Sequence, residues 1–370
     1  MGCLPVLANG TFSLIDFRYH LVSIVAVFLA LAVGIIVGAS AIQPEVVSGL
    51  KAESQLQKKT NETLRSANAT LSRQLNADDL FAQVASGYLL GRLLEGEQVV
   101  LVAAPGADSQ SVTGITSALR QAGATVTGQV ILTSQFLDIS ASTEINLNAL
   151  ARQLAPAGTV VGSAAAGQIY GQQAAAQVIA AAIVHKDGQA TVTSNQSQAI
   201  LSGFSQAGFL QVSGANGGTT LAGLATLAVV VIPANPPANA SSPANLALVA
   251  FAHELQRASD GALLAGSLPG SGTGSAIDAV TSGAAGVVIT TVDNANTTSG
   301  QIIVIWALRQ MLDRHTAPAA YGVVPDAVPS PAPTTTPTAS PSPTPTRSAR
   351  SSRSAKSSRS AQARKHPVKS

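Results

Sequence analysis

Hydrophobic and polar positions divide the chain into segments of different kinds. Residues 21–42 contain no ionisable side chain and are apolar almost throughout. At 1.5 Å of rise per residue, a helix of this length spans about 33 Å, which matches the roughly 30 Å apolar core of a bilayer. We therefore predict a transmembrane anchor at 21–42, after a short N-terminal segment at 1–20. Cleavage after Ala41 is the alternative, because Ala39-Ser40-Ala41 has the form of a signal peptidase site.

Small residues recur at every fourth position of the predicted anchor and form one stripe along a helix: Ala26, Ala30, Gly34 and Gly38. Such a stripe lets two membrane helices approach closely. The same spacing also arises by chance, because Gly and Ala are common in membrane helices. The stripe predicts a helix-packing face, with chance spacing as its alternative.

A polar stretch with helical spacing follows, and we predict a coiled-coil stalk at 45–96. Positions at a repeated spacing of four and three residues run along it, and half of them are leucine: Leu50, Leu64, Leu71 and Leu75. The polar members of this seam include Asn61 and Asn68, a residue type that fixes register at a cost in stability. A single solvated helix is the alternative. Because the stripe and the seam are consecutive, we favour a parallel homodimer, or a coiled coil with a different chain.

Residues 97–324 alternate short apolar runs with helical patterns, which is typical of a mostly parallel α/β domain. We predict a Rossmann-like head. Its first unit is a buried strand at 98–106, a helix at 111–123 that is closed by Gly123, and a strand at 124–132. The second half predicts strands at 224–233, 261–268 and 286–293 and helices at 245–258, 275–283 and 300–312. Right-handed crossovers would join these strands into one sheet.

Charge separates a tail from this body. The chain carries a net charge of +3, but eight Lys and Arg side chains lie in the last 24 residues. Residues 1–326 hold 13 basic and 18 acidic side chains, a net charge of −5. The segment 325–370 is rich in Pro, Ser and Thr and lacks the large apolar side chains of a core, so we predict a disordered tail. Its basic half could contact an anionic envelope polymer or lipid headgroups, or be a solvated extension without a partner; we expect no nucleic-acid partner.

A glycine-rich loop at 266–280 invites a nucleotide interpretation. Asp293 ends the next predicted strand, about where a ribose-binding acid would stand. The dinucleotide fingerprint fails, however, because Ser275 and Ile277 occupy the third glycine place in the two registers. No Walker sequence occurs either. A nucleotide-binding protein is therefore a remote alternative. The simpler interpretation of this segment is a flexible loop at the carboxyl edge of the sheet.

Other chemistry is sparse. His253-Glu254 begins like a zinc-protease motif, but Arg257 stands where the second histidine belongs. No G-x-S-x-G elbow exposes a serine. Cys3 is the only cysteine, so no internal disulfide can form. We expect no enzyme and see no evident cofactor; the metal ligands are unknown, since the histidines and the single methionine beyond the anchor are scattered: His185, His253, His315, His366 and Met311.

The residues at the start of the membrane helix, Arg18, Tyr19 and His20, together with the stalk and the closing segment 292–329, resemble a known family. It is the actinobacterial copper transport protein family, MctB. The resemblance covers roughly residues 14–326. It implies a cell-envelope protein with a role in copper efflux or tolerance in or near the outer membrane. The chain is also similar to the coiled-coil subunit of an actinobacterial complex that controls septal wall hydrolysis, which implies cell-wall-remodelling partners.

Copper as a cofactor or cargo is implied by this resemblance alone. Copper(I) prefers thiolate and thioether ligands, and beyond the anchor the chain has no Cys and one Met. A single helix cannot line a pore. We therefore expect a scaffold in copper tolerance, with an envelope scaffold for wall hydrolysis as the alternative. Lys51, Lys58 and Lys59 outnumber Arg18 around the anchor and argue for a cytoplasmic head, whereas the resemblance implies an extracytoplasmic one, which we favour.

Overall fold

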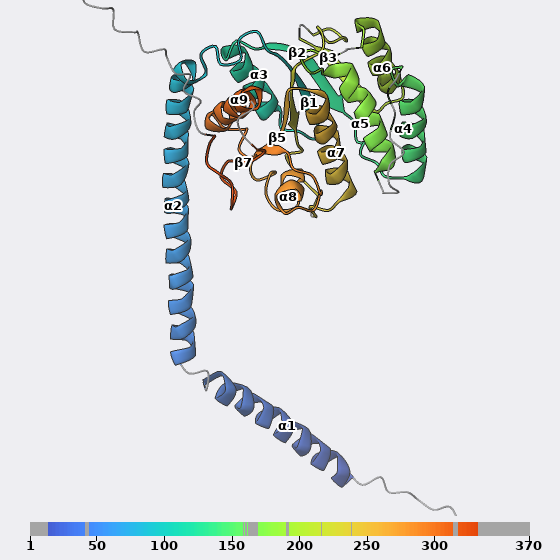
Figure 1. Cartoon of the computed structure of the whole chain (residues 1–370). Coiled ribbons are helices and arrows are strands. Elements are labelled where there is room, and N and C mark those ends of the chain that lie inside the picture. The colour runs from blue at the N-terminus through green and yellow to red at the C-terminus, as the bar shows by residue number, and fades with distance from the viewer. Residues whose placement is uncertain are drawn as a thin grey trace, which may run out of the picture. The chain divides into compact units, whose positions relative to one another are not determined.

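The computed structural model describes residues 14–40, 44–157, 159, 161, 169–189, 192–215, 217–237, 239–313 and 317–331. Two compact units make up the chain (Figure 1). The first comprises residues 1–91 with 297–299, and the second residues 92–296 with 300–370. Ala41 and the part of the predicted tail from residue 332 onwards lie outside the described residues.

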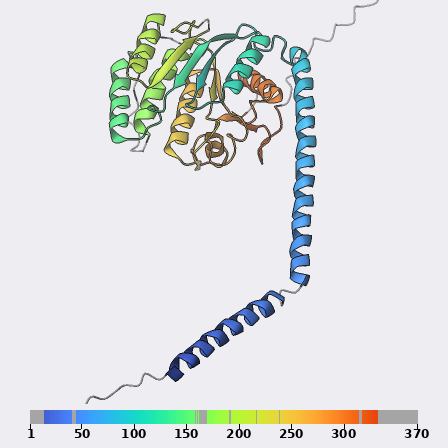
Figure 2. The same ribbon diagram turned by 180° about the vertical axis from the view of Figure 1, so that it is seen from behind.

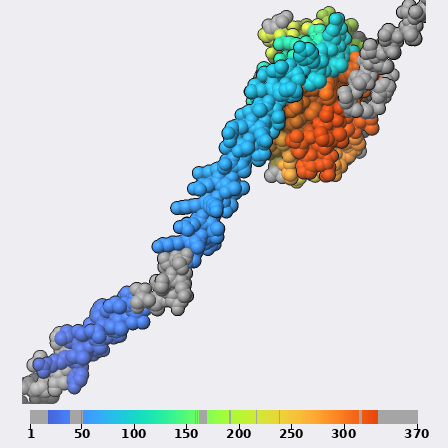
Figure 3. Space-filling view, turned by 90° about the vertical axis from the view of Figure 1, so that its left-hand side faces the viewer, coloured from blue at the N-terminus to red at the C-terminus, as the bar shows by residue number. Residues whose placement is uncertain are grey.

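The first unit is dominated by two helices, α1 (Leu14–Ser40) and α2 (Pro44–Leu90). The stretch Arg18–Gly38 of α1 has a mean hydropathy of 2.9 and no buried residue, and it is long and apolar enough to cross a bilayer. Residues 51–78 of α2 are all exposed, and their side chains project around a single helix (Figure 3). Both helices are largely exposed but differ in composition, because α1 is apolar on every side whereas α2 is mostly polar.

Within the described residues, the second unit is built on a seven-stranded sheet with the order β3-β2-β1-β4-β5-β6-β7. Neighbouring strands are parallel except for the antiparallel pair of β2 and β3. The strands are β1 (Gln98–Ala103), β2 (Thr125–Leu132), β3 (Leu210–Gly214), β4 (Leu227–Val231), β5 (Gly261–Ala265), β6 (Thr290–Val292) and β7 (Ala320–Tyr321). The predicted mostly parallel α/β head is therefore confirmed.

Helices cover both faces of this sheet. They are α3 (Ser109–Gln121), α4 (Ala141–Leu154), α5 (Tyr170–Ile183), α6 (Ser194–Gln206), α7 (Pro243–Ala258), α8 (Ala276–Thr281) and α9 (Thr298–Leu312). α3 and α9 lie on one face and α5 and α7 on the other, and the view from behind agrees (Figures 1 and 2). α4 and α6 pack against α5 on its outer side. Such a three-layer arrangement is the usual way to bury a parallel sheet.

The larger core lies between the sheet and α5 and α7. The middle of α5 is rich in alanine and almost wholly buried, so its small side chains let α4 and α7 pack closely on both sides of it. Phe136 and Phe251 meet edge to face at 5.6 Å between ring centroids in this core. Gly171 at the start of α5 is required by sterics, because a Cβ there would lie 2.3 Å from Glu144 O.

Several predicted details of the head agree with the structure. α3 ends where Gly123 adopts a φ of +86°, and the Gly123 N–H donates to Arg120 O. The predicted strands and helices from residue 224 onwards all occur, although β6 is only three residues long. The sequence pattern did not predict α4, α5, α6 or β3. β3 is short and lies at the sheet edge, where its exposed Gln211 and half-buried Ser213 weaken the apolar pattern of a strand.

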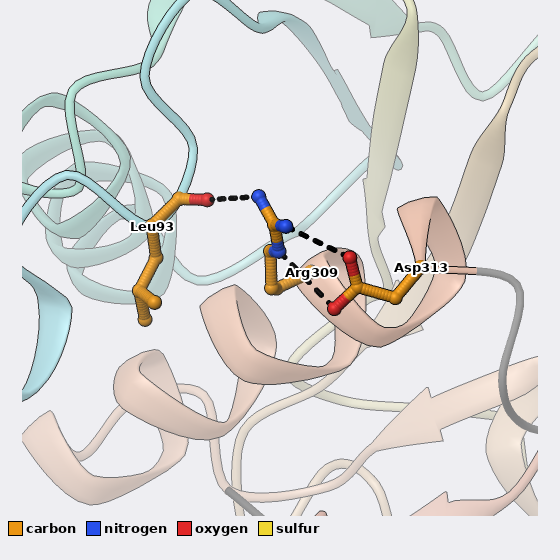
Figure 4. Close-up of polar contacts among 3 residues, drawn as sticks. All are labelled: Leu93, Arg309 and Asp313. Carbon is orange, nitrogen blue, oxygen red and sulfur yellow. Dashed lines mark hydrogen bonds and ion pairs between the residues drawn. The ribbon is translucent and has the colours of Figure 1, made fainter. Parts of the chain in front are cut away.

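One arginine joins α9 to the segment that precedes β1. Arg309 donates from Nη1 to Leu93 O at 3.1 Å (Figure 4). It also donates from Nη2 to Asp313 Oδ1 at 2.8 Å and from Nε to Asp313 Oδ2 at 3.2 Å. The guanidinium fork matches a carboxylate in this two-pronged way. The contact connects two segments of the second unit that are more than 200 residues apart in sequence.

Candidate functional site

The small residues predicted to pack against another membrane helix lie along α1. Ala26, Ala30, Gly34 and Gly38 are all exposed. A Cβ added to Gly34 or Gly38 would meet no atom within 4 Å. The stripe therefore has room for a second helix, and helix pairing there stays a prediction. Arg18, Tyr19 and His20 are exposed at the start of the apolar stretch. Their role as a motif at the entry to the membrane also stays a prediction.

The predicted stalk residues lie in α2. Leu64, Leu71 and Leu75 have exposed fractions of 59, 55 and 68% and lie on one side of the helix, while the side chain of Leu50 is outside the described set. A large apolar side chain in water is what a coiled-coil seam presents before it pairs. Pairing through these leucines stays a prediction, because a single helix offers the same surface.

A second apolar face on α2 was missed by the sequence reasoning. Phe81, Val84 and Tyr88 are exposed, with Tyr88 at 93%. Their spacing of three and four residues places them on one side of the helix, which was a readable signal. This face lies well away from the leucine seam, because the two sets differ in register by one residue, or about 100° around the helix.

In the second unit, main-chain hydrogen bonds link two loops at the place where open α/β sheets usually bind ligands. The strand order reverses between β1 and β4, so the crevice is expected beyond their carboxyl ends. There Ala104 N donates to Val231 O and Ala234 N donates to Gly106 O, both at 2.9 Å. Main-chain bonds thus join the loop after β1 to the loop after β4 at this place.

The helix that follows β1 is also satisfied from within. Asp108 caps α3 and accepts hydrogen bonds from Ser111 N at 2.9 Å, Ser111 Oγ at 2.6 Å and Gln110 N at 3.3 Å. The Ser111 hydroxyl, followed by these backbone amides, lowers the pKa of the Asp108 carboxyl despite partial burial. An anion at this helix start would meet a carboxylate that already uses the free N–H groups.

The glycine-rich loop lies beside Asp293, the acid considered for ribose binding, but both make internal contacts. The Asp293 carboxylate is buried and accepts hydrogen bonds from Val323 N at 2.9 and 3.0 Å and from Val324 N at 2.9 Å. The Ser271 hydroxyl donates to Asp293 O. The carboxylate that a ribose would need therefore anchors the segment after β7 instead.

The glycines of the loop serve close packing of the protein on itself. A Cβ at Gly270 would lie 2.1 Å from Ala234 O, so the loop backbone presses against the segment after β4. Gly274 N donates to Asp278 Oδ2 at 2.7 Å, and Ser275 caps the short helix α8. The loop is thus explained without a phosphate, and these contacts weigh against the nucleotide alternative.

The residues considered for metal binding do not come together where the structure describes them. No three His, Cys, Asp or Glu side chains form a metal-holding group among the described residues. His185 donates its backbone N–H to Ala225 O, and His253 lies half-buried on α7. Met311 packs against Gly261 of β5. His315 and His366 are outside the described residues.

Comparisons with known proteins point to one family. The family model described as "Copper transport outer membrane protein, MctB" matches residues 14–331. The protein named "Copper transporter MctB" from Mycobacterium tuberculosis is 28% identical over 303 residues, which cover 81% of this chain and 94% of that protein. The Mycobacterium bovis protein of the same name gives the same values. The Mycobacterium leprae one is 30% identical over 317 residues, covering 84% and 96%.

Proposed function

The chain belongs to the MctB family of copper transport outer membrane proteins, and from this premise we propose that it supports copper tolerance as a membrane-anchored scaffold. The family description places it in copper transport at a membrane of the cell envelope. The observation that carries the scaffold mechanism is the order of two helices along the chain: one exposed apolar helix, α1, is followed by a long exposed polar helix, α2. A single transmembrane helix cannot enclose a path for an ion, because a pore needs several helices or a closed barrel.

Self-association is part of this proposal. The stripe that contains Gly34 and Gly38 and the seam that contains Leu64 and Leu71 lie on consecutive helices. A parallel pair of chains would use both at once, since close helix approach in the membrane and burial of leucine outside it favour the same arrangement. We further propose that the head is extracytoplasmic, in keeping with the family description.

Copper is the cargo or the toxic ion in this scheme, and the scaffold would act through partner proteins. Copper(I) is held best by sulfur ligands. The thioether of Met311 packs on β5 instead of projecting from the surface. Handling of copper by a partner held on the scaffold fits these residues better than direct transport by this chain.

The decisive experiment combines copper survival with crosslinking in the native host. A strain that lacks the chain receives either the unchanged sequence or the double variant Gly34→Ile and Gly38→Ile. The added branched side chains would separate the paired helices, so we expect lower survival on copper and fewer dimers. Ala32→Ile is the matched control, because it makes a similar change about 200° around the helix from Gly34.

Dimers are measured by oxidative crosslinking of Leu64→Cys, with Cys3→Ser removing the native thiol. Glu62→Cys is the control on the opposite side of α2, about 200° away. Crosslinking at Leu64→Cys alone supports the seam. Equal crosslinking at both positions, or unchanged copper survival after the glycine substitutions, contradicts the proposal.

Copper content and co-purifying proteins distinguish the mechanisms. Full-length chain is isolated from native membranes and analysed for bound copper and for proteins that accompany it. Copper-free chain with copper-handling partners supports the proposal. Stoichiometric copper that is lost when His185 and His253 are replaced would indicate direct metal handling. Copper-free chain that brings down wall-remodelling proteins would favour the alternative role in septal wall hydrolysis.

A further inference from the structure

A polar hollow in the head has no part in the proposed function. It has a volume of about 470 Å³ and lies between α6, β3 and the segment 219–224. α6 and β3 pack against each other near one end of the sheet (Figure 1). The hydroxyl and amide side chains that line the hollow are Ser194, Ser197, Gln198, Ser202, Ser205, Gln206, Gln211, Thr219 and Thr220. This size is within the usual range of small-molecule sites.

The wall formed by α6 is the polar side of an amphipathic surface helix. Ile200, Leu201 and Phe204 are buried. A neighbouring face carries Ser and Gln at helical spacing and borders the hollow. Because serine is short, this face leaves space where longer side chains would fill it.

Internal contacts hold the walls in place. The Ser197 hydroxyl donates to Ala182 O of α5 and fixes α6. Across the hollow, Ala222 N donates to Thr127 O of β2 at 2.9 Å, and the Leu221 side chain lies over Gly128. A hollow with anchored walls loses little conformational entropy when it binds a ligand.

The lining chemistry restricts the ligand. None of the described residues that border the hollow is ionisable, so neither a metal ion nor a phosphate finds a charged partner there. Amides and hydroxyls both donate and accept hydrogen bonds. A purely apolar ligand would leave them without partners, whereas an uncharged ligand with many hydroxyls would satisfy them. Leu201, Val212 and Leu221 add apolar contacts for the C–H faces of such a ligand.

An extended peptide fits this place less well than a sugar. It would add to the sheet along β3, the edge strand. Gly214 N, however, already donates to Gly218 O at 2.7 Å, so a tight turn takes part of that edge. We therefore propose that the hollow binds a neutral saccharide, with Gln198 and Gln211 as hydrogen-bonding side chains on its two walls.

The test measures binding of chitotriose, an uncharged sugar with hydroxyls and amides, to the full-length chain by titration calorimetry. The detergent must lack a sugar headgroup, because such a headgroup could occupy the hollow. We expect a dissociation constant on the order of 1 mM, and a loss of at least tenfold in affinity in the double variant Gln198→Leu and Gln211→Leu. Asn195→Leu, an exposed position of α6 outside the hollow, is the matched control and should bind like the unchanged chain.

Each outcome is decisive. Loss of binding in the double variant alone, with its unfolding midpoint unchanged, supports the site. If neither chitotriose nor maltotriose binds at 10 mM, or if the double variant binds as well as the unchanged chain, the inference is wrong. An uncharged Ser/Thr peptide that binds at the hollow while both sugars fail would replace the saccharide with a peptide ligand and overturn it as well.

Discussion

Replacing Asp293 with Asn tests whether this buried carboxylate serves the fold or a ligand. The side chain is 1% exposed and accepts hydrogen bonds from the backbone N–H groups of Val323 and Val324. A hydrogen bond to a charged acceptor contributes about 1.5–3 kcal/mol. Both carboxylate oxygens accept from Val323 N, so in either orientation of an Asn side chain its NH₂ group would face the Val323 N–H, donor against donor. We therefore expect the free energy of unfolding to fall by about 3 kcal/mol.

The assay is urea unfolding of the full-length chain in micelles, followed by the fluorescence of Trp306. This residue is the only tryptophan and lies in α9 of the second unit, so it reports on the head. With a urea dependence of roughly 2 kcal/mol per molar, the midpoint should drop by about 1.5 M. Asp326→Asn is the matched control, because Asp326 is exposed in the same segment. Equal midpoints for the two variants would refute the structural role of Asp293 and revive a ligand role.

Three further predictions use the same unfolding assay. Asp108→Asn should destabilise the head at pH 7. Because the folded pKa of Asp108 lies below its ordinary value of 3.8, the difference in unfolding free energy between this variant and the unchanged chain should persist above about pH 5 and shrink as the pH falls below 4. A constant difference down to about pH 2 would contradict this explanation. Arg309→Leu should cost about 1–2 kcal/mol and Arg309→Lys nearly as much, because Lys lacks the planar fork; full stability in Arg309→Lys would show that charge alone suffices. Gly270→Ala should cost about 2–4 kcal/mol because its Cβ meets backbone oxygen at 2.1 Å, whereas Gly272→Ala, with 3.4 Å to its nearest atom, should cost less than 1 kcal/mol; similar losses would contradict the steric explanation.

The parallel part of the head could be predicted because its strands are continuous apolar runs. β4 (Leu227–Val231) is buried at every residue, and such a run between turn residues has few other interpretations. α5 was harder to assign, since its alanines carry little periodic contrast and are buried for their small size. β3 was missed because an edge strand with polar members resembles a loop.

The candidate sites were less predictable than the fold, because their meaning depends on partners distant in sequence. Asp293 and the glycine-rich loop do lie together. Nothing in the local sequence, however, indicated that the backbone amides of Val323 and Val324 donate hydrogen bonds to this carboxylate. The polar hollow combines α6 with a segment beyond β3, and only the folded chain brings them together. Small residues at helical spacing were visible in α1, whereas Phe81 and Tyr88 would have required a second register to be traced along α2.

The two ends of the sheet bear on how the protein behaves when it is crowded on a membrane surface. β7 has two residues, and the five-residue β3 leads into a glycine turn. Short edges are poor templates for strands of neighbouring molecules, which protects β proteins from aggregation. Anchoring confines molecules to two dimensions and raises their local concentration, so long open edges would invite sheet-to-sheet polymerisation. Edges this short limit that route of polymerisation.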